Sequence, residues 1–178
     1  MNRMICRLNR VVLATALLLI LPLLAMQVTG EVAWSPADFV VAGTLLAGTG
    51  FMYVLSASNA CTPIYRAAVG MALAAALLLV WMNLAVGVIG TERNRANLIY
   101  VGVLAVGFVG ALIARLRPLG MARALFATAL AAAVVAAIAL SLGLGSPESE
   151  PLEVLVLNGL FVALFTGSAV LFRKAARD

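Results

Sequence analysis

The sequence predicts an all-α integral membrane protein, a bundle of six transmembrane helices with both termini in the cytoplasm. Of its 178 residues, 65% are apolar and 11% are charged, and the mean hydropathy is +1.13. A soluble domain of average composition is roughly half apolar and about a quarter charged. Because so few charges do not make a water-soluble surface, we expect most of the apolar side chains to face lipid.

Six apolar stretches take up almost the whole chain and predict a single transmembrane domain, residues 1–178. The stretches cover residues 11–29, 39–55, 67–89, 97–114, 120–144 and 153–172. Each is close to the ~20 residues that a helix needs to cross about 30 Å of hydrocarbon. Membrane β-strands alternate apolar and polar residues, whereas residues 67–89 are apolar on every side, which favours helices.

The first stretch follows the basic segment MNRMICRLNR and has two interpretations. It is either a retained first span or a secretory signal with a basic n-region and an apolar h-region, whose cleavage would leave five spans. The lack of a clear small-x-small cleavage site and the presence of Pro22 within the apolar run favour the retained span. No lipobox cysteine follows the run.

Helix-start signals precede the second and third stretches. Ser35 is a suitable N-cap, with Pro36 at the first helical position and Asp38 at the third, which resembles a capping box. Thr62 followed by Pro63 repeats this pattern before the third stretch. Both signals support helices that begin close to the apolar runs.

The later stretches carry comparable boundary signals. Gly90 is expected to end the third helix and Asn94 to cap the fourth. Before the sixth stretch, Ser149 is a candidate cap, and Glu150 and Glu153 supply acids to the first turn.

The basic residues predict the orientation. In a six-span topology ten of the twelve lie on one side: Arg3, Arg7, Arg10, Arg66, Arg115, Arg117, Arg123, Arg173, Lys174 and Arg177. By the positive-inside rule this side is cytoplasmic. Most acids fall on the other side: Glu31, Asp38, Glu92, Glu148, Glu150 and Glu153. Cys6 and Cys61 lie on the reducing side, so no structural disulfide is expected.

Several function classes lack their usual residues. The chain has no histidine, and its two cysteines form no CxxC motif, so neither a metal nor another cofactor is predicted. No charged residue lies near the middle of a stretch, where proton relays and ion-coupled transporters place them. The arginines lie singly or in small groups between apolar runs and do not form a basic face on a soluble domain, which argues against nucleic-acid binding. We therefore expect no enzymatic activity.

Small residues recur four positions apart within the apolar stretches. The sets are Gly43 and Ala47, Gly70 and Ala74, Gly107 and Ala111, Gly110 and Ala114, and Ala129, Ala133 and Ala137. Such residues share a helix face and allow helices to approach closely in lipid. They are expected to pack within the bundle; docking to another membrane protein is the alternative.

A polar cluster on the outer side is the candidate site. It comprises Asn83, Glu92, Arg93, Arg95, Asn97 and Asn158. The three asparagines are expected to lie beneath the charged loop, with Asn83 and Asn158 roughly 8–10 Å below the outer boundary. One hypothesis is that the cluster contacts a ligand or a partner. The alternative is structural: the asparagines bond across helices and Glu92 pairs with an arginine at the surface.

The run NLAVGVIGTERNRANLIYVGVLAVGFVGALIARLRPLGMARALFATAL, residues 83–130, resembles an uncharacterised family of small bacterial multi-pass inner-membrane proteins. The resemblance extends more loosely to the terminal LFRKAARD. It implies a location in the bacterial inner (plasma) membrane and no known activity. Relatives carry an acidic, proline-containing loop in place of TERNRAN, so Arg93 and Arg95 depart from the family pattern. Any role that needs an acidic loop is therefore in doubt.

Two functions from different classes remain. The first is a non-catalytic accessory or structural membrane component, forming a homo-oligomer or joining a larger complex through its small-residue faces. The alternative is a small permease or channel-like protein for a neutral or weakly polar solute or a lipid, with Asn83, Asn97 and Asn158 at its outer vestibule. In both cases the expected partners are the lipid bilayer and anionic lipids at the cytoplasmic face.

Overall fold

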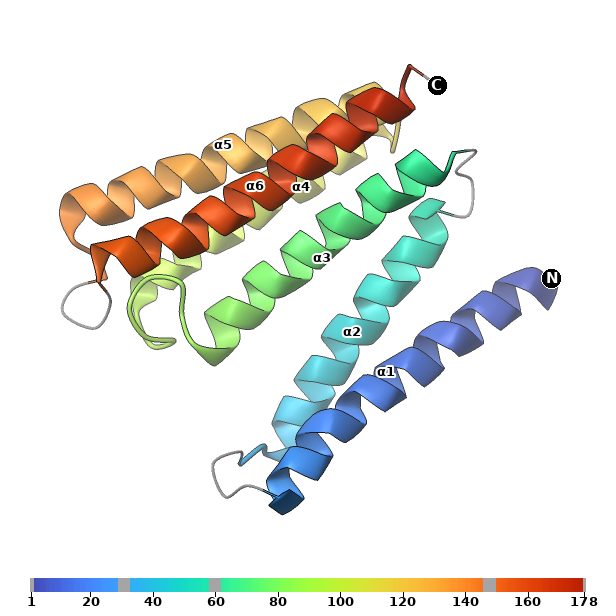
Figure 1. Ribbon diagram of the computed structural model, residues 1–178, viewed down its shortest axis with the longest axis horizontal. Coiled ribbons are helices and arrows are strands. Elements are labelled where there is room, and N and C mark those ends of the chain that lie inside the picture. Colours follow the sequence, from blue (N-terminus) through green and yellow to red (C-terminus); the bar gives the residue numbers. More distant parts are fainter. Residues whose placement is uncertain (1, 29–32, 58–61, 146–149, 178) are drawn as a thin grey trace. The chain divides into compact units, whose positions relative to one another are not determined.

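A computed structural model describes residues 2–28, 33–57, 62–145 and 150–177, which contain helices and no strand. Figure 1 shows the elements in chain order: α1 (Asn2–Val28), α2 (Pro36–Ala57), α3 (Pro63–Ala85), the 3₁₀ turn η1 (Arg95–Leu98), α4 (Ile99–Ala114), α5 (Pro118–Leu142) and α6 (Pro151–Ala175). Six helices are long and apolar enough to cross a membrane, η1 and α4 together forming the fourth. The all-α class and the six apolar helices predicted from the sequence are confirmed.

The chain divides into two compact units, residues 1–59 and 60–178, and each is described by itself. The first unit is the hairpin of α1 and α2. A Cβ added to Gly50 would overlap the side chain of Val11, and one added to Gly43 would lie 3.4 Å from Leu19. Glycines of α2 therefore allow close approach to α1.

The predicted helix-start signals of α2 and α3 are confirmed. The carboxylate of Asp38 accepts hydrogen bonds from the backbone N–H and the hydroxyl of Ser35, at 2.7 and 2.8 Å. The Asp38 N–H in turn donates to the Ser35 hydroxyl oxygen at 3.3 Å, which completes a capping box. Thr62 caps α3 by accepting a bond of 3.3 Å from the Tyr65 N–H. The candidate cap Ser149 lies outside the described residues, and Glu150 holds the N-cap position of α6 without a side-chain bond.

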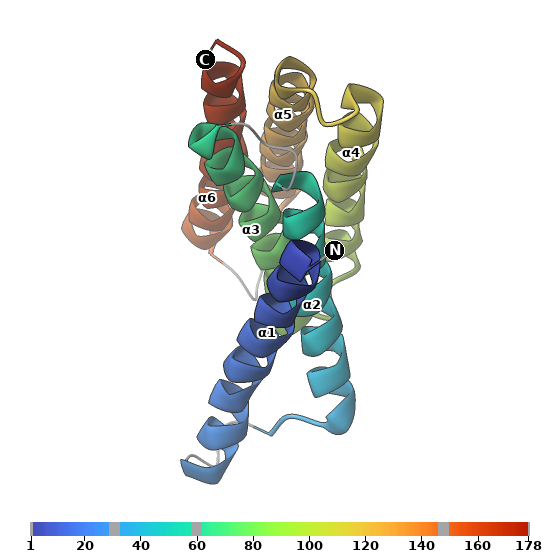
Figure 2. The same cartoon turned by 90° about the vertical axis from the view of Figure 1, so that its right-hand side faces the viewer.

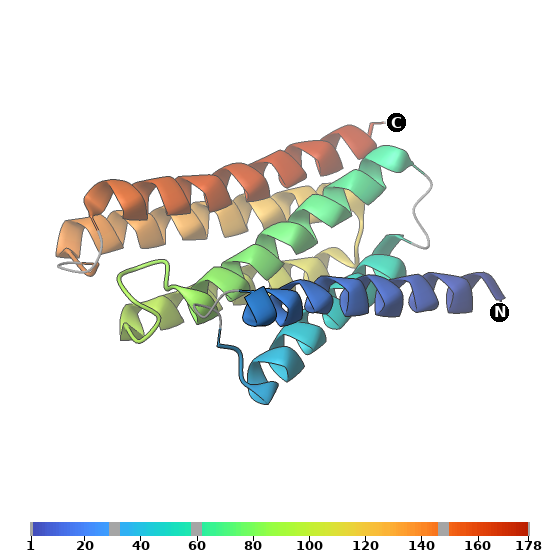
Figure 3. The same cartoon turned by 60° about the horizontal axis from the view of Figure 1, so that its bottom comes forward.

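In the second unit α5 and α6 are the central helices. α3 packs on α6, α6 packs on α5, and α5 packs on α4. Figures 2 and 3 show this order from two further directions. α5 buries the largest share of its length among the six helices. Its neighbour α6 contributes the buried aromatic side chains Phe161, Phe165 and Phe172.

Small residues bring α4 and α5 together, as expected for intramolecular packing. A Cβ added to Gly110 would lie 2.6 Å from that of Ala124, and one added to Gly107 would lie 3.1 Å from the Thr128 hydroxyl. The three alanines of α5 that recur every four residues do not all face the core. Ala129 is buried, Ala133 is partly buried and Ala137 is exposed, so a strict four-residue spacing drifts off the buried face.

The third helix ends earlier than the sequence suggested. We expected an apolar span up to residue 89, ended by Gly90, but α3 ends at Ala85 and the chain turns at Gly87 with φ of +86°. Of the apolar residues that follow, Val86 is exposed, whereas Val88 and Ile89 are buried in a loop; none of them continues the helix. A run of apolar residues does not distinguish a lipid-facing helix from a buried loop, and this explains the error.

Most basic residues of the second unit lie at one of its ends. The Tyr65 ring of α3 packs edge-on against Phe172 of α6 at 5.1 Å, and the Tyr65 hydroxyl donates a 2.7 Å bond to the carbonyl of Leu116, between α4 and α5. These contacts place the start of α3, the α4–α5 turn and the end of α6 together. The loop between α3 and α4 lies at the opposite end, beside the turn that follows α5.

Candidate functional site

Residues 86–98, called the outer loop below after the orientation predicted from the sequence, fold back onto the end of the second unit. The side chains of Val88 and Ile89 are only 1% and 0% exposed, so they anchor the loop in the core. Gly87 makes this path possible, because its positive φ and the adjacent backbone of Thr91 leave no room for a Cβ. The loop is therefore a packed part of the fold.

Asn97 holds the outer loop in shape. Its Oδ1 atom accepts hydrogen bonds from the N–H groups of Val88 and Ile89, at 3.0 and 2.9 Å. Its Nδ2 atom donates to the carbonyls of Ile89 and Thr91, at 3.2 and 2.8 Å. All four hydrogen-bonding positions of the amide are thus occupied by the loop backbone. Asn97 has no remaining capacity to bind a ligand without dismantling the loop.

Asn94 connects the outer loop to the rest of the second unit. Its Oδ1 atom accepts a bond of 3.0 Å from the Ala96 N–H, so Asn94 caps the 3₁₀ turn η1 that leads into α4; the N-cap of α4 itself is Leu98, which makes no side-chain bond. Its Nδ2 atom donates to the carbonyl of Leu144, beyond α5, at 2.8 Å. The second bond was not foreseen, because no local sequence pattern links residues fifty positions apart.

The charged residues of the outer loop lie at its surface. Arg93 and Glu92 are 3.7 Å apart at their closest charged atoms, and their side chains are 92% and 47% exposed. Arg95 is also exposed. An ion pair in water at this separation contributes about 0–1 kcal/mol, so these charges do little to stabilise the loop.

Asn158 and Tyr100 form a buried polar pair between α6 and α4. The Tyr100 hydroxyl donates to Asn158 Oδ1 at 2.7 Å, and Asn158 Nδ2 donates to the carbonyl of Val154 at 2.8 Å. Both side chains are at most 2% exposed. The sequence did not predict Tyr100 as the partner of Asn158, because a tyrosine within an apolar run is expected to serve only in packing.

Asn83 differs from the other two asparagines. Its Nδ2 atom donates to the carbonyl of Leu79, one helical turn earlier, at 2.7 Å. Its Oδ1 atom is buried and has no hydrogen-bond partner among the described residues. A buried amide oxygen without a partner costs about 1–3 kcal/mol.

The predicted polar cluster is therefore not joined by its own bonds. Within the described ranges, no hydrogen bond connects any two of Asn83, Asn97 and Asn158, and each is bonded to its own helix, its loop or Tyr100. Nor does this part of the chain contain a group of three or more metal-ligating side chains.

Six long apolar helices joined by short connections indicate a multi-pass membrane protein. No protein-family model, curated protein or solved structure matches the chain. The resemblance of residues 83–130 to small bacterial inner-membrane proteins accordingly remains an interpretation of the sequence.

Proposed function

We propose that the protein is a non-catalytic component of a bacterial inner membrane that uses the outer loop to contact a partner on the aqueous side. The observation that carries this proposal is the use of Asn97. All four hydrogen bonds of this buried amide go to the backbone of the outer loop and fix its conformation. The charged side chains of the loop, Arg93 and Arg95, are exposed to solvent. Such an arrangement suits a preformed recognition surface, because a rigid loop loses little entropy on binding.

Orientation is part of the same proposal. The described acids of the second unit, Glu92, Glu150 and Glu153, lie at the end of the outer loop, and the arginines of the α4–α5 turn lie at the other end. By the positive-inside rule the outer loop then faces the periplasm and both termini face the cytoplasm. With Cys6 and Cys61 replaced by serine, an Arg93→Cys variant should react with a membrane-impermeant maleimide in intact spheroplasts, and an Arg177→Cys variant should react only after lysis. The reverse pattern would overturn this orientation.

The partner is tested by native mass spectrometry of protein extracted gently from its own membrane. We expect a larger protein to co-purify in a stoichiometric complex. An Arg93→Ala/Arg95→Ala variant should lose this partner, whereas a Lys174→Ala/Arg177→Ala variant, which changes the net charge equally, should retain it. Retention of the partner by the outer-loop variant would contradict the proposed surface. Both pairs are exposed in the structure, so neither change should affect folding.

A small permease is the second candidate, and one observation favours it. The Oδ1 atom of Asn83 is buried within α3 without a described partner, and it is an acceptor that a neutral, hydrogen-bonding solute would satisfy. If the extracted protein is a homo-oligomer that retains a small molecule, and Asn83→Leu abolishes this retention, the permease replaces the accessory role.

A further inference from the structure

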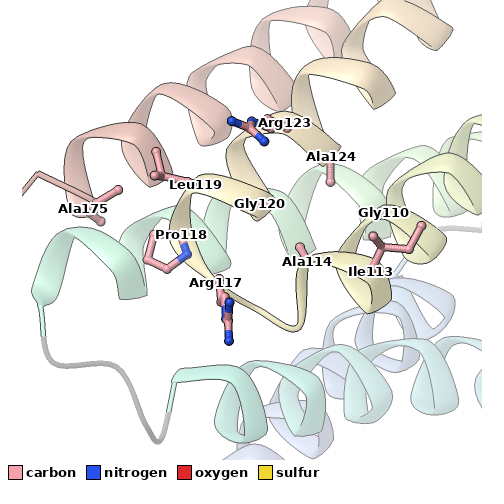
Figure 4. Close-up of a pocket in the computed structure, with 11 residues that line it drawn as sticks. Gly110, Ile113, Ala114, Arg117, Pro118, Leu119, Gly120, Arg123, Ala124 and Ala175 are labelled. Atoms are coloured by element: carbon pink, nitrogen blue, oxygen red, sulfur yellow. The ribbon is translucent and has the colours of Figure 1, made fainter.

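The basic end of the second unit contains an open pocket of about 890 Å³ between the α4–α5 turn and the end of α6. Its floor is made of small residues from the close α4–α5 contact, Gly110, Ala114, Gly120 and Ala124. Figure 4 shows Arg117 at the turn and Arg123 further along α5, on opposite edges of this floor. The pocket thus combines an apolar base with a cationic rim.

A second hollow of about 260 Å³ adjoins the first. The two hollows share Leu119 and Arg123, and the second adds Arg173 from the last turn of α6. Three arginines from two helices therefore border one continuous region of the surface. None of them pairs with an acidic side chain within the described ranges, where the acids of this unit lie at the opposite end.

The backbone of the α4–α5 turn is held in an unusual conformation. Arg115 and Leu116 have φ of 48° and 58°, in the left-handed region that favours glycine. The Tyr65 hydroxyl secures the turn through the Leu116 carbonyl, and the Arg117 N–H donates to the Ala114 carbonyl at 2.9 Å. Backbone strain of this kind persists where the surroundings impose it, and it often marks a functional site.

The strained turn also determines how α5 begins. Arg117 is the N-cap residue, and no side-chain oxygen bonds to the first-turn N–H groups. The positive end of the helix dipole and these N–H groups therefore add to the positive potential of the neighbouring guanidinium groups. An anion in this position would meet two kinds of donor.

We propose that this pocket binds one anionic glycerophospholipid, with its anionic headgroup at the rim between Arg117 and Arg123 and its acyl chains along the neighbouring apolar surface. A lipid fits better than a free phosphate, because the pocket lies where three membrane-spanning helices begin or end and has an apolar floor. Ile113 and Leu119, which are 78% and 57% exposed, border the same pocket and suit acyl chains. The site is independent of the outer loop and of its partner.

The test uses native mass spectrometry of the full chain, titrated with phosphatidylglycerol or phosphatidylcholine in detergent. We expect phosphatidylglycerol to bind at least about tenfold more tightly than phosphatidylcholine, and an Arg117→Gln/Arg123→Gln variant to lose at least about tenfold in phosphatidylglycerol affinity, because charge-assisted bonds are lost. A Lys174→Gln/Arg177→Gln variant changes the charge equally at the same end, outside the pocket, and should retain the affinity. An Arg117→Lys/Arg123→Lys variant should retain part of it.

Three results would overturn the proposal. Equal losses in the two glutamine variants would show general attraction between charges and no defined site. Full binding by the Arg117→Gln/Arg123→Gln variant would place the lipid elsewhere. Displacement of phosphatidylglycerol by millimolar inorganic phosphate, with no dependence on acyl chains, would assign the pocket to a soluble anion.

Discussion

The hydroxyl of Tyr100 donates a 2.7 Å hydrogen bond to Oδ1 of Asn158, and this bond joins α4 to α6, two helices that both pack on α5. Both groups are buried, and neither has access to water. In an apolar interior such a bond specifies which faces of the two helices meet. Loss of either partner leaves a polar group unpaired.

Tyr100→Phe should therefore lower the free energy of unfolding by about 1–2 kcal/mol, because Asn158 Oδ1 loses its donor. Unfolding in mixed micelles with increasing dodecyl sulfate measures the change. The double variant with Asn158→Leu should cost less than the two single changes together, since it removes both polar groups. Strict additivity would mean that the two residues are not coupled. Tyr53→Phe, at a more exposed tyrosine of α2, is the matched control and should be neutral.

Asn97→Ala should release the outer loop. The change removes four hydrogen bonds and leaves the N–H groups of Val88 and Ile89 buried without an acceptor, at a cost of about 2–4 kcal/mol. Amide hydrogen exchange should accelerate across residues 86–94 and little elsewhere. Arg95→Ala, two positions away at the surface, should leave exchange unchanged. Slow exchange in the Asn97→Ala variant would show that apolar anchoring alone holds the loop.

Gly110→Ala should separate α4 from α5, because the new Cβ would lie 2.6 Å from that of Ala124. We expect a loss of about 1–3 kcal/mol in the free energy of unfolding. Gly102→Ala, in the same helix with no atom within 4 Å of its new Cβ, should be neutral or stabilising by up to about 1 kcal/mol. Similar effects at the two positions would argue against this close packing.

Asn83→Leu should not destabilise the protein and should raise its unfolding free energy, since the Asn83 Oδ1 atom has no described partner. Asn158→Leu provides the comparison and should destabilise. Thermal unfolding in detergent distinguishes the two. A large loss for Asn83→Leu would show that the oxygen has a partner, such as a bound solute or a second chain.

The sequence predicted six long apolar helices and the caps of α2 and α3 because these features depend on local chemistry. A span needs only enough consecutive apolar residues to match the bilayer, and a cap such as Ser35 with Asp38 is complete within four positions. The error at the end of α3 shows the limit of this reasoning. Val88 and Ile89 look like helix residues in the sequence, but the tertiary structure buries them in a loop.

The roles of the polar side chains were decided by the tertiary structure alone. Asn83, Asn97 and Asn158 are the same residue type, yet the first has an unpartnered oxygen among the described residues, the second shapes a loop and the third bonds to a tyrosine. Likewise, Arg117, Arg123 and Arg173 indicated only orientation in the sequence, and the packing of α5 against α4 and α6 brings them to one region. Hydropathy is a sum over neighbouring residues and determines which segments enter the membrane. A hydrogen-bond partner or a pocket depends on residues far apart in the chain, and only packing brings them together.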